Sequence, residues 1–317
     1  MSVLVTGVAG FIGSHLAEAL LSRGEDVIGV DCFLDYYPRE LKEANLASLA
    51  HSDAFTLIDQ PIQEMDLEPL LAKVSVVYHL AAQAGVRASW GRDFSIYTDN
   101  NILATQRLLE AAVSERPSAL VYASSSSVYG DVKELPMTEA TPLHPVSPYG
   151  VSKLAVENLC YLYSINHQVP TVGLRYFTVY GPRQRPDMAF HRLLCSARDG
   201  EDFPLYGDGR QTRDFTYVAD AVEATLRAAA AGRPGGVYNV GGGSRVSLLD
   251  VIREIEDITG AKVRLRREAS QKGDMRDTYA DTTAARTELG YRPRVTLRDG
   301  LQAEWDWLKA AETSAGL

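Results

Sequence analysis

The chain has 317 residues, with 32 lysines and arginines against 41 aspartates and glutamates, and a formal net charge of -9. This acidic balance argues against nucleic acid and membrane partners, because both carry dense negative charge. Its 45% of hydrophobic and 23% of charged residues are ordinary for a globular protein and exclude wholesale disorder. The length allows one large domain or two modest ones.

The cysteine spacing and the absence of targeting segments indicate the cellular compartment of the protein. The cysteines, Cys32, Cys160 and Cys195, are scattered without a C-x-x-C pair. This spacing argues against a disulfide scaffold and against a zinc site, so we expect no bound metal. No stretch approaches the ~20 apolar residues of a membrane span, and the N-terminus lacks the basic-then-apolar layout of a signal peptide. The sequence therefore predicts a cytoplasmic protein.

The first half of the chain alternates apolar runs with amphipathic segments. Continuous apolar strands separated by helices are typical of a parallel sheet that is covered on both faces. The fold class predicted from this pattern is α/β, with a doubly wound parallel sheet of the Rossmann type. The predicted strands are residues 3–5, 26–30, 74–80 and 119–123, and the predicted helices are residues 15–21 and 101–113.

The pattern changes after Tyr180, where a Gly-Pro pair interrupts the chain. From there the segments are shorter and less regular, although a capping box at residues 247–250 predicts a helix that Gly260 ends. We interpret residues 1–180 as a cofactor-binding domain and residues 181–317 mainly as a smaller, substrate-binding lobe. Some segments of the second part are expected to return to the first domain.

A glycine-rich turn follows the first predicted strand. Residues 6–13, Thr-Gly-Val-Ala-Gly-Phe-Ile-Gly, place glycines where a backbone turns tightly and approaches a pyrophosphate at the N-terminus of a helix. Alone, such a run also suits an ordinary strand-to-helix turn. Asp31 ends the second strand, near the ~20-residue offset of the acid that binds the adenosine ribose in dinucleotide sites. Its carboxylate would repel a 2′-phosphate, so NAD is the predicted cofactor, even with Arg39 nearby. The candidate cofactor contacts are Gly7, Gly10, Phe11, Ile12, Gly13 and Asp31.

Tyr149 and Lys153 are four residues apart in a segment expected to be helical, so their side chains share one face. An ammonium beside the phenol favours the phenolate and lowers the tyrosine pKa, which makes Tyr149 a candidate general base for a sugar hydroxyl. By itself, such a pair is more often an ordinary surface pair. Four serines, residues 124–127, directly follow a predicted strand, at the edge where parallel sheets bind ligands. Their hydroxyls complete a candidate site.

At these residues the chain resembles the extended short-chain dehydrogenase/reductase family, over nearly its whole length. The resemblance implies that a serine, a tyrosine and a lysine are catalytic, that Asn101 lies on the cofactor side, and that Arg213 faces the diphosphate of a nucleotide sugar. The alternative role for Arg213 is a surface salt bridge. Asp274 is taken as a further substrate contact. The matching glycines and catalytic residues are Gly7, Gly10, Gly13, Ser125, Tyr149 and Lys153.

One stretch departs from the family pattern. The family often has Gly-Asp after its third strand, with the aspartate contacting adenine, whereas this chain has Gln60, Pro61 and Ile62. Proline supplies no carboxylate, so we expect adenine to be held by packing against Ile62 and by backbone contacts.

The two residues after Ser125 discriminate among the reactions of the family. Sugar-nucleotide 4,6-dehydratases resemble this chain but carry Asp-Glu there, and UDP-glucuronate decarboxylases tend to carry a glutamate at the second position. Here Ser126 and Ser127 lack the acid that elimination requires, and we assign them to substrate binding. Epimerisation at C4 needs only the tyrosine system and the nicotinamide, so it is the predicted reaction. A non-enzymatic NAD-sensing protein is disfavoured because Tyr149 and Lys153 are both present.

The run at residues 174–189 looks like that of UDP-glucuronate 4-epimerases. UDP-glucose 4-epimerases usually have asparagine where this chain has Thr178. A C5 carboxylate needs a hydroxyl donor and a cation, for which Thr178 and Arg185 are the candidates. The alternative is that Thr178 caps a strand and Arg185 is a solvated loop residue. Upstream stretches with the same resemblance are residues 35–37, 41–44 and 83–87, and Arg87 at the end of the last is a candidate substrate contact.

The expected reaction is the NAD-dependent conversion of UDP-glucuronate to UDP-galacturonate through a transient 4-keto sugar. Tyr149 would take the proton of the C4 hydroxyl and also contact the cofactor. Ser125 would hydrogen-bond the same oxygen, and Lys153 would hold the cofactor ribose. UDP-glucose or a UDP-pentose is the alternative substrate. In this family the helices near Asn101 and Tyr149 often pair across a dimer axis, so a homodimer is expected.

Overall fold

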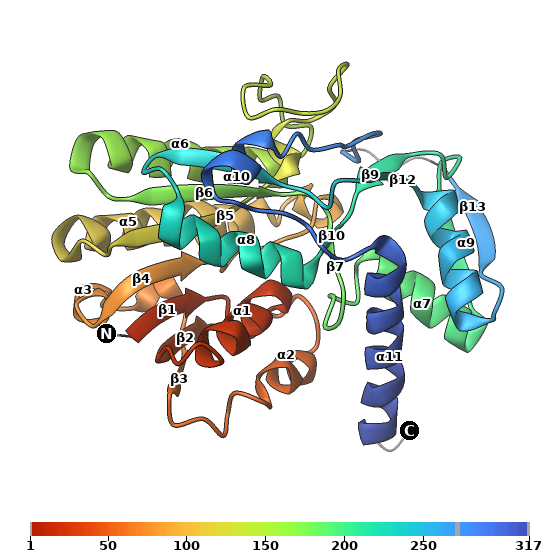
Figure 1. Ribbon diagram of the computed structural model, residues 1–317, viewed down its shortest axis with the longest axis horizontal. Coiled ribbons are helices and arrows are strands. Elements are labelled where there is room, and N and C mark those ends of the chain that lie inside the picture. Colours follow the sequence, from red (N-terminus) through yellow and green to blue (C-terminus); the bar gives the residue numbers. More distant parts are fainter. Residues whose placement is uncertain (1, 270–272, 316–317) are drawn as a thin grey trace.

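The computed structural model describes residues 2–269 and 273–315, which form a larger lobe built on a parallel sheet and a smaller lobe beside it (Figure 1). The strands are β1 (Ser2–Thr6), β2 (Val27–Asp31), β3 (Phe55–Asp59), β4 (Val74–His79), β5 (Ala119–Ser125), β6 (Thr171–Tyr176), β7 (Val179–Tyr180), β8 (Asp202–Tyr206), β9 (Thr212–Asp214), β10 (Thr216–Tyr217), β11 (Gly236–Val240), β12 (Arg245–Ser247) and β13 (Arg264–Glu268). The helices are α1 (Phe11–Leu21), α2 (Arg39–Leu46), α3 (Glu68–Leu71), α4 (Phe94–Tyr97), α5 (Ala104–Glu115), α6 (Pro148–His167), α7 (Ala189–Asp199), α8 (Val218–Ala231), α9 (Leu248–Thr259), α10 (Thr283–Glu288) and α11 (Leu297–Ala315).

The large sheet has seven parallel strands in the order β11-β6-β5-β4-β1-β2-β3 within the described residues. The chain runs outward from β1 to β3, then crosses back to β4 and continues outward on the other side. The strand order therefore reverses between β1 and β4. In open parallel sheets, ligands bind at the carboxyl edge beside such a reversal. The prediction of a doubly wound α/β fold is confirmed.

Three strands of this sheet, β3, β6 and β11, were not predicted from the sequence. β3 is an edge strand that exposes three of its five side chains, so burial imposes little apolar pattern on it. β6 is buried along its whole length but includes Arg175, whose charge interrupts the apolar run. β11 comes from the second half of the chain and pairs with β6, so the chain returns to the large sheet after it has entered the smaller lobe.

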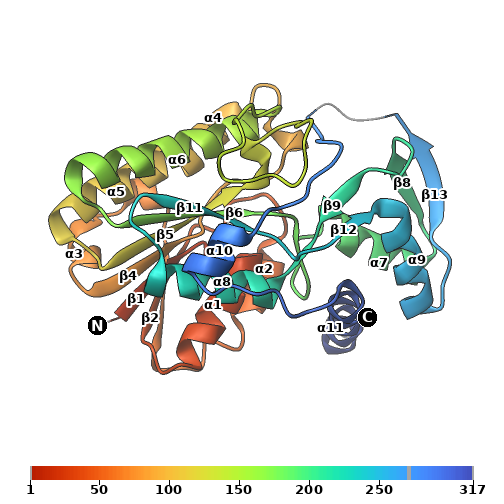
Figure 2. The same ribbon diagram turned by 45° about the horizontal axis from the view of Figure 1, so that its top comes forward.

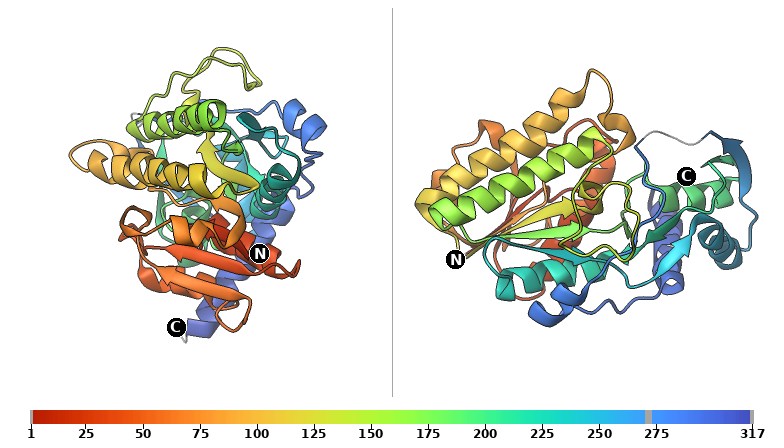
Figure 3. Two further views of the ribbon diagram at one scale, coloured as in Figure 1. Left: turned by 90° about the vertical axis from the view of Figure 1, so that its left-hand side faces the viewer. Right: turned by 90° about the horizontal axis from the view of Figure 1, so that it is seen from above.

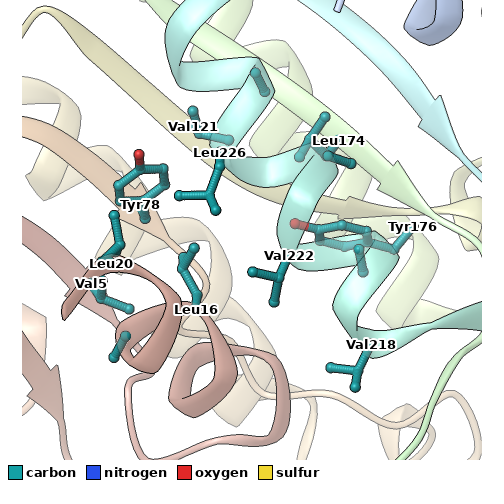
Figure 4. Close-up of a cluster of buried hydrophobic side chains, with 14 of the residues drawn as sticks. Val5, Leu16, Leu20, Tyr78, Val121, Leu174, Tyr176, Val218, Val222 and Leu226 are labelled. Carbon is teal, nitrogen blue, oxygen red and sulfur yellow. The ribbon is translucent and has the colours of Figure 1, made fainter. Parts of the chain in front are cut away.

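Two helical layers cover the sheet (Figure 2). α3, α5 and α6 pack on one face, and α1 and α8 pack on the other. Figure 4 shows the second layer, where leucines and valines of α1 and α8 meet side chains of β1, β4, β5 and β6. Each fully buried aliphatic side chain contributes about 1.5–3 kcal/mol. This packing holds β1 and α1 in place, and with them the glycine turn that joins the two elements.

The smaller lobe lies at the carboxyl edge of the sheet and has a core of its own (Figure 3). In it α7, α9 and α11 pack together, and β8 pairs with β13. The predicted helix start is present with Ser247 as its N-cap: the Ser247 hydroxyl accepts the Asp250 N–H at 3.2 Å and donates to the Asp250 carboxylate at 2.6 Å, and α9 ends before Gly260. In the part of the chain that the structure describes, no helix is both long enough and apolar enough to cross a membrane.

Candidate active site

A cavity of about 920 Å³ lies at the carboxyl edge of the large sheet and is lined by residues of both lobes. Its walls include the glycine turn after β1, the serines after β5 and the first turns of α6. From the other side, β8, β9 and the loop before α7 contribute. All the residues predicted from the sequence for catalysis, cofactor binding and substrate binding line this cavity, except Asn101.

The glycine turn leaves no room for side chains at two of its positions. Gly7 has a φ of +70°, and a Cβ there would lie 2.8 Å from the Ala81 backbone. A Cβ at Gly13 would lie 2.1 Å from the Gly7 carbonyl oxygen. None of the described side chains caps the N-terminus of α1, so its first amide groups remain available to an anion. The turn therefore has the geometry expected of a pyrophosphate site.

Asp31 lines the cavity next to this turn. Its carboxylate accepts the N–H of Ala9 at 3.0 Å and that of Phe33 at 2.9 Å, and burial raises its pKa. Arg39, the nearby cation, donates to two carboxylates at 2.7 and 2.6 Å and is thereby neutralised. These pairings leave this part of the wall acidic, which favours NAD over NADP.

The stretch that lacks the family's aspartate also lines the cavity. The Gln60 N–H donates to the Asp31 carbonyl at 3.0 Å, and the Ile62 side chain is buried against the core. Pro61 contributes no polar group of its side chain. The contact of adenine with Ile62 and the backbone therefore stays a prediction, and these residues line the cavity where it would occur.

Asn101 does not line the cavity but holds a segment that does. It is buried in a π-helical stretch, Thr98–Leu103, directly before α5. Its amide donates to the Gln83 carbonyl at 3.0 Å and to the Ser152 hydroxyl at 2.9 Å, and its oxygen accepts the Gln83 N–H at 2.7 Å. Since Gln83 lines the cavity, Asn101 positions the loop after β4 and joins it to α6.

Tyr149 and Lys153 lie in the first turns of α6, and both line the cavity. Ser147 caps this helix, because its hydroxyl accepts the Gly150 N–H at 3.1 Å. The Lys153 Nζ donates to the carbonyl oxygen of Ala123, on β5, at 2.9 Å. The helix cap and the neighbouring strand therefore fix the predicted catalytic pair at the carboxyl edge of the sheet.

Burial dominates the electrostatics of this pair. It lowers the pKa of Lys153 to about 8. Burial also raises the pKa of Tyr149, while hydrogen bonding with Ser125 and the positive charge of Arg185 act in the opposite direction. The lowering of the Tyr149 pKa that the helical spacing predicts is therefore not observed, because desolvation of the phenolate outweighs the favourable contacts.

The four serines after β5 have different roles. The Ser124 hydroxyl donates to the buried Glu157 carboxylate. The Ser125 hydroxyl accepts the Ser127 N–H and donates to the Ser127 hydroxyl, both at 3.1 Å, and so caps a short turn, Ser126–Val128. With Ser124 engaged, the hydroxyls of Ser125, Ser126 and Ser127 are those that remain to contact a ligand.

A buried ion pair beneath the serines was not predicted. The Arg175 guanidinium donates from Nη2 and Nε to the two oxygens of Glu157, at 2.7 and 2.9 Å, and both side chains are almost fully buried. Arg175 also donates to the Tyr129 hydroxyl at 2.8 Å. Glu157 lies one helical turn after Lys153, so its position on the catalytic face is visible in the sequence. Its partner is not, because Arg175 reaches it only through the pairing of β6 with β5.

Arg185, the predicted cation for a sugar carboxylate, is part of a three-residue group. Its Nε and Nη2 donate to the two carboxylate oxygens of Asp187, at 2.9 and 3.1 Å. The Tyr36 hydroxyl donates to the same carboxylate at 3.1 Å. Tyr36 belongs to a stretch that resembles UDP-glucuronate 4-epimerases, but its contact with Asp187 was not predicted, since 151 positions separate the two residues.

Thr178 and Arg213 line the same part of the cavity. The Thr178 carbonyl accepts the Thr216 N–H at 3.0 Å, beside the pairing of β7 with β10, so the backbone at Thr178 is fixed. Arg213 donates to the backbone carbonyls of Thr212 and Arg276, at 2.9 and 2.8 Å. Among the described residues it has no carboxylate partner within ion-pair distance, and burial lowers its pKa. Its positive charge is therefore available to an anionic ligand.

The two remaining candidates for substrate binding contact each other. Arg87 and Asp274 form an ion pair of 2.5 Å between segments 187 positions apart. The Arg87 guanidinium also lies 4.2 Å from the centre of the Tyr206 ring. This contact joins the loop after β4 to the smaller lobe at the cavity wall.

The donor set of the cavity fits a dinucleotide and a second anionic ligand. Within residues 2–269 and 273–315, no group of histidine, cysteine, aspartate and glutamate side chains is arranged to hold a metal ion. The glycine turn and the acid of β2 form one half of the cavity, and Arg185 and Arg213 lie in the other. The catalytic pair and the serines line the same continuous space.

Known proteins are similar to this chain in sequence and in fold. Residues 3–241 match the model of the NAD dependent epimerase/dehydratase family. The uncharacterized UDP-glucose epimerase YtcB of Bacillus subtilis strain 168 is 46% identical over 314 residues, which cover 98% of each chain. A probable UDP-glucuronate 4-epimerase of Rhizobium meliloti strain 1021 is 33% identical over 330 residues, covering 97% of this chain and 96% of that one. The crystal structure of UDP-glucuronic acid 4-epimerase from Bacillus cereus, in complex with UDP-glucuronic acid and NAD, superposes with a TM-score of 0.95 at 46% identity, covering 98% of this chain and all of that one. The chain therefore belongs to the NAD-dependent epimerase/dehydratase family, and NAD is its cofactor.

Proposed function

We propose that the protein interconverts UDP-glucuronate and UDP-galacturonate as an NAD-dependent 4-epimerase. The observation that carries the proposal is the Arg185 guanidinium, which lines the cavity close enough to Tyr149 for its charge to act on the phenol. The sugar carboxylate is attached to C5, next to the carbon whose hydroxyl Tyr149 would deprotonate. A sugar whose C4 hydroxyl contacts Tyr149 can therefore place its carboxylate against Arg185. The likeness to the B. cereus enzyme, whose structure holds UDP-glucuronic acid and NAD, supports the same substrate.

The proposed mechanism begins with Tyr149 as the general base for the C4 hydroxyl. Ser125 and Arg185 both act in favour of its phenolate. NAD, when bound, supplies the chemistry of hydride acceptance and return at C4. Ser125 hydrogen-bonds the C4 oxygen, and Lys153, anchored by the Ala123 carbonyl, provides donors to the cofactor ribose.

Inversion requires the 4-keto sugar to present its other face before it is reduced. Arg213 holds the diphosphate in this scheme, because its guanidinium is fixed by backbone carbonyls and has no carboxylate partner among the described residues. The ring then turns about its diphosphate linkage while the nucleotide stays in place. The sugar can hydrogen-bond to hydroxyl groups before and after the ring turns. These hydroxyls belong to Ser126, Ser127 and Thr178.

The 4-keto intermediate of this substrate is a β-keto acid and has to be protected. If the C5–carboxylate bond breaks, carbon dioxide leaves, the electron pair forms an enolate that takes up a proton, and UDP-4-keto-pentose is released with the cofactor left reduced. The bond breaks most readily when the carboxylate is perpendicular to the carbonyl plane. Arg185 and Thr178 prevent this by holding the carboxylate in one orientation.

The test is to incubate the purified protein separately with UDP-glucuronate, UDP-glucose and UDP-xylose and to resolve the nucleotide sugars by chromatography. We expect UDP-glucuronate to be converted to UDP-galacturonate and the two neutral sugars to react slowly. A preference for a neutral sugar would retain the epimerase but remove the carboxylate contact. Carbon dioxide or a keto sugar as the main product would contradict epimerisation itself.

We also propose that the enzyme is a cytoplasmic homodimer that pairs through α5 and α6. These helices lie side by side along the outside of the larger lobe (Figure 3). α6 and the segment that leads into α5 expose large apolar side chains that a second copy of the same face would cover. Light scattering at micromolar concentration tests this, and a monomer would contradict it. The exposed residues are Val151, Tyr161, Leu162 and Ile165 on α6, together with Ile96 on α4 and Leu103 in the π-helical stretch before α5.

We further propose that the two lobes bind different ligands. We assign the cofactor to the lobe of the large sheet, residues 1–180, and the nucleotide sugar mainly to residues 181–317. The segments of α8 and β11, which pack on the large sheet, belong to the first lobe in structure. Mutations that abolish UDP binding without affecting NAD binding should therefore cluster beyond residue 181.

A further inference from the structure

Asp187 and Tyr36 have no part in the mechanism above, yet they determine how Arg185 is presented. Arg185 uses one edge of its guanidinium, Nε and Nη2, for the two oxygens of Asp187. The other edge, formed by Nη1 and the second N–H of Nη2, has no hydrogen-bond partner among the residues that the structure describes. A planar guanidinium can receive a second carboxylate along that edge with two parallel hydrogen bonds.

Asp187 is itself fixed in position by Tyr36. The Tyr36 hydroxyl donates to Oδ2 of Asp187, the same oxygen that accepts from Nη2 of Arg185. A Cβ at Gly85 would lie 2.3 Å from this hydroxyl, so the loop after β4 packs directly against Tyr36. The guanidinium carbon lies 5.7 Å from the centre of the Tyr36 ring. Three loops, after β2, β4 and β7, therefore meet at one side chain that would contact the substrate.

We infer that Asp187, supported by Tyr36, is a specificity-determining positioning residue that aims the free edge of Arg185 at the C5 carboxylate of the sugar. The inference rests on the proposed function. With Asp187 in place, a carboxylate gains two hydrogen bonds without breaking an existing pair. A neutral sugar has no carboxylate for the free edge of the guanidinium and gains no such contact.

The same arrangement protects the β-keto acid. A guanidinium that is held only by its flexible side chain can follow the carboxylate as it rotates toward the geometry that releases carbon dioxide. Asp187 prevents this because it fixes the plane of the guanidinium with two hydrogen bonds. Loss of Asp187 should therefore affect two quantities together: the preference for UDP-glucuronate and the share of turnovers that end in decarboxylation.

The experiment compares Asp187→Asn with a matched control. Asparagine keeps the size of the side chain but loses the charge and one acceptor oxygen. The ratio of kcat/KM for UDP-glucuronate to that for UDP-xylose, which has no C5 carboxylate, should fall about fivefold, as expected for a partly exposed ion pair. The share of turnovers that release carbon dioxide should rise. Tyr36→Phe should change both quantities in the same direction by a smaller factor.

Asp199→Asn is the control because it alters the same kind of pair elsewhere. Arg198 donates to Asp199 from Nε and Nη2, at 2.7 and 2.9 Å. The exposed fractions of these two side chains are 26% and 41%, close to 21% for Arg185 and 40% for Asp187, but neither residue lines the cavity. This variant should behave like the parent in both quantities.

The outcomes separate the inference from the proposed function. The decarboxylated share is a ratio per turnover, so partial unfolding of a variant does not change it. Parent-like values of both quantities in Asp187→Asn and Tyr36→Phe would overturn the inference, as would equal losses with UDP-glucuronate and UDP-xylose. If the unmodified protein fails to convert UDP-glucuronate, the proposed function is wrong and the inference falls with it, and this result appears before any variant is made.

Discussion

The two halves of the cavity are built in different ways. The cofactor half is formed largely by backbone from one contiguous turn, closed by Asp31 at the end of the next strand. The sugar half is formed by charged and polar side chains that come from segments far apart in the chain. Its ion pairs and hydrogen bonds join positions 151 and 187 residues apart. The sugar-half residues are Tyr36, Arg87, Thr178, Arg185, Asp187, Arg213 and Asp274.

This difference shows how one fold can keep its cofactor and change its substrate. The turn between β1 and α1 excludes side chains at Gly7 and Gly13 on steric grounds, so substitutions there disturb the backbone itself. In the sugar half, the backbone is fixed independently by strand pairing, as at Thr178. A side chain such as Arg185 can therefore be exchanged without moving the scaffold. The predictions below test this contrast.

The largest effect is expected where the two halves meet, at Tyr149. Tyr149→Phe removes the hydroxyl that we propose takes the C4 proton, so kcat with UDP-glucuronate should fall by about 10³-fold, within the usual range for general acid–base catalysis. NAD and UDP affinities, measured by calorimetry, should remain within about twofold of the parent, because phenylalanine keeps the ring and all other binding contacts are unchanged. A fall in kcat of less than tenfold would contradict the assignment of Tyr149 as the base.

The next effect tests the cofactor half alone. In Gly13→Ala the new Cβ would lie 2.1 Å from the Gly7 carbonyl oxygen, and relieving such an overlap costs about 1–3 kcal/mol. NAD affinity should fall by about tenfold or more, while UDP affinity is retained. Gly24→Ala is the control, since a Cβ there meets no atom within 4 Å although its φ is +81°. Equal NAD affinity in the two variants would show that the turn tolerates a side chain.

The sugar half should respond in the opposite manner. Arg213→Gln removes a charge-assisted contact to the diphosphate, so the affinity for UDP should fall by about tenfold to a hundredfold. The loss should be the same for UDP-glucuronate and UDP-xylose, because both carry the same diphosphate. NAD affinity should not change. A loss confined to UDP-glucuronate would place Arg213 at the sugar instead of the diphosphate.

The contrast also explains how much the sequence could predict. The glycine turn, Asp31 and the Tyr149–Lys153 pair lie in local patterns whose spacing reflects helix and strand geometry, and the structure brings them to one cavity. The bond from Tyr36 to Asp187 depends on the loops after β2 and β7 meeting, which follows from tertiary packing and not from spacing. The sequence identified Arg185 as the candidate cation for the sugar carboxylate, but it could not predict how the guanidinium is oriented.

The same limit applies to the electrostatics of the catalytic pair. Helical spacing predicts that the ammonium of Lys153 lowers the pKa of Tyr149, but the extent of burial is set by the whole fold. In the structure, burial raises the pKa of Tyr149. Sequence spacing therefore placed the two groups correctly on one helix but gave the wrong direction for the tyrosine pKa.

The pH dependence of Lys153 gives the fourth prediction. Burial lowers its pKa from 10.5 to about 8, and its charged form is the one that we propose holds the cofactor ribose, so kcat/KM should fall as pH rises through about 8. Stability should move the other way. Between about pH 8 and 10.5 the unfolded chain binds this proton and the folded chain does not, so the free energy of unfolding rises with pH. Lys153→Met should lack this rise in denaturant titrations, and a variant that retains it would contradict the assignment.

The smallest effect is expected at Arg183, which connects the two halves. Its Nη2 donates to Glu18 on α1 at 2.6 Å, so the loop that carries Arg185 is tied to the helix that opens the cofactor site. Arg183 has a φ of +66°, and alanine would meet the same backbone strain, so Arg183→Ala removes the ion pair without relieving that strain. KM for UDP-glucuronate should rise by about twofold to fivefold, and high salt should produce part of the same change in the parent. Arg23→Ala breaks a comparable pair with Glu223, away from the cavity, and should leave KM at the parent value. If both variants shift KM equally, KM depends on the packing of α1 as a whole and not on the ion pair between Arg183 and Glu18.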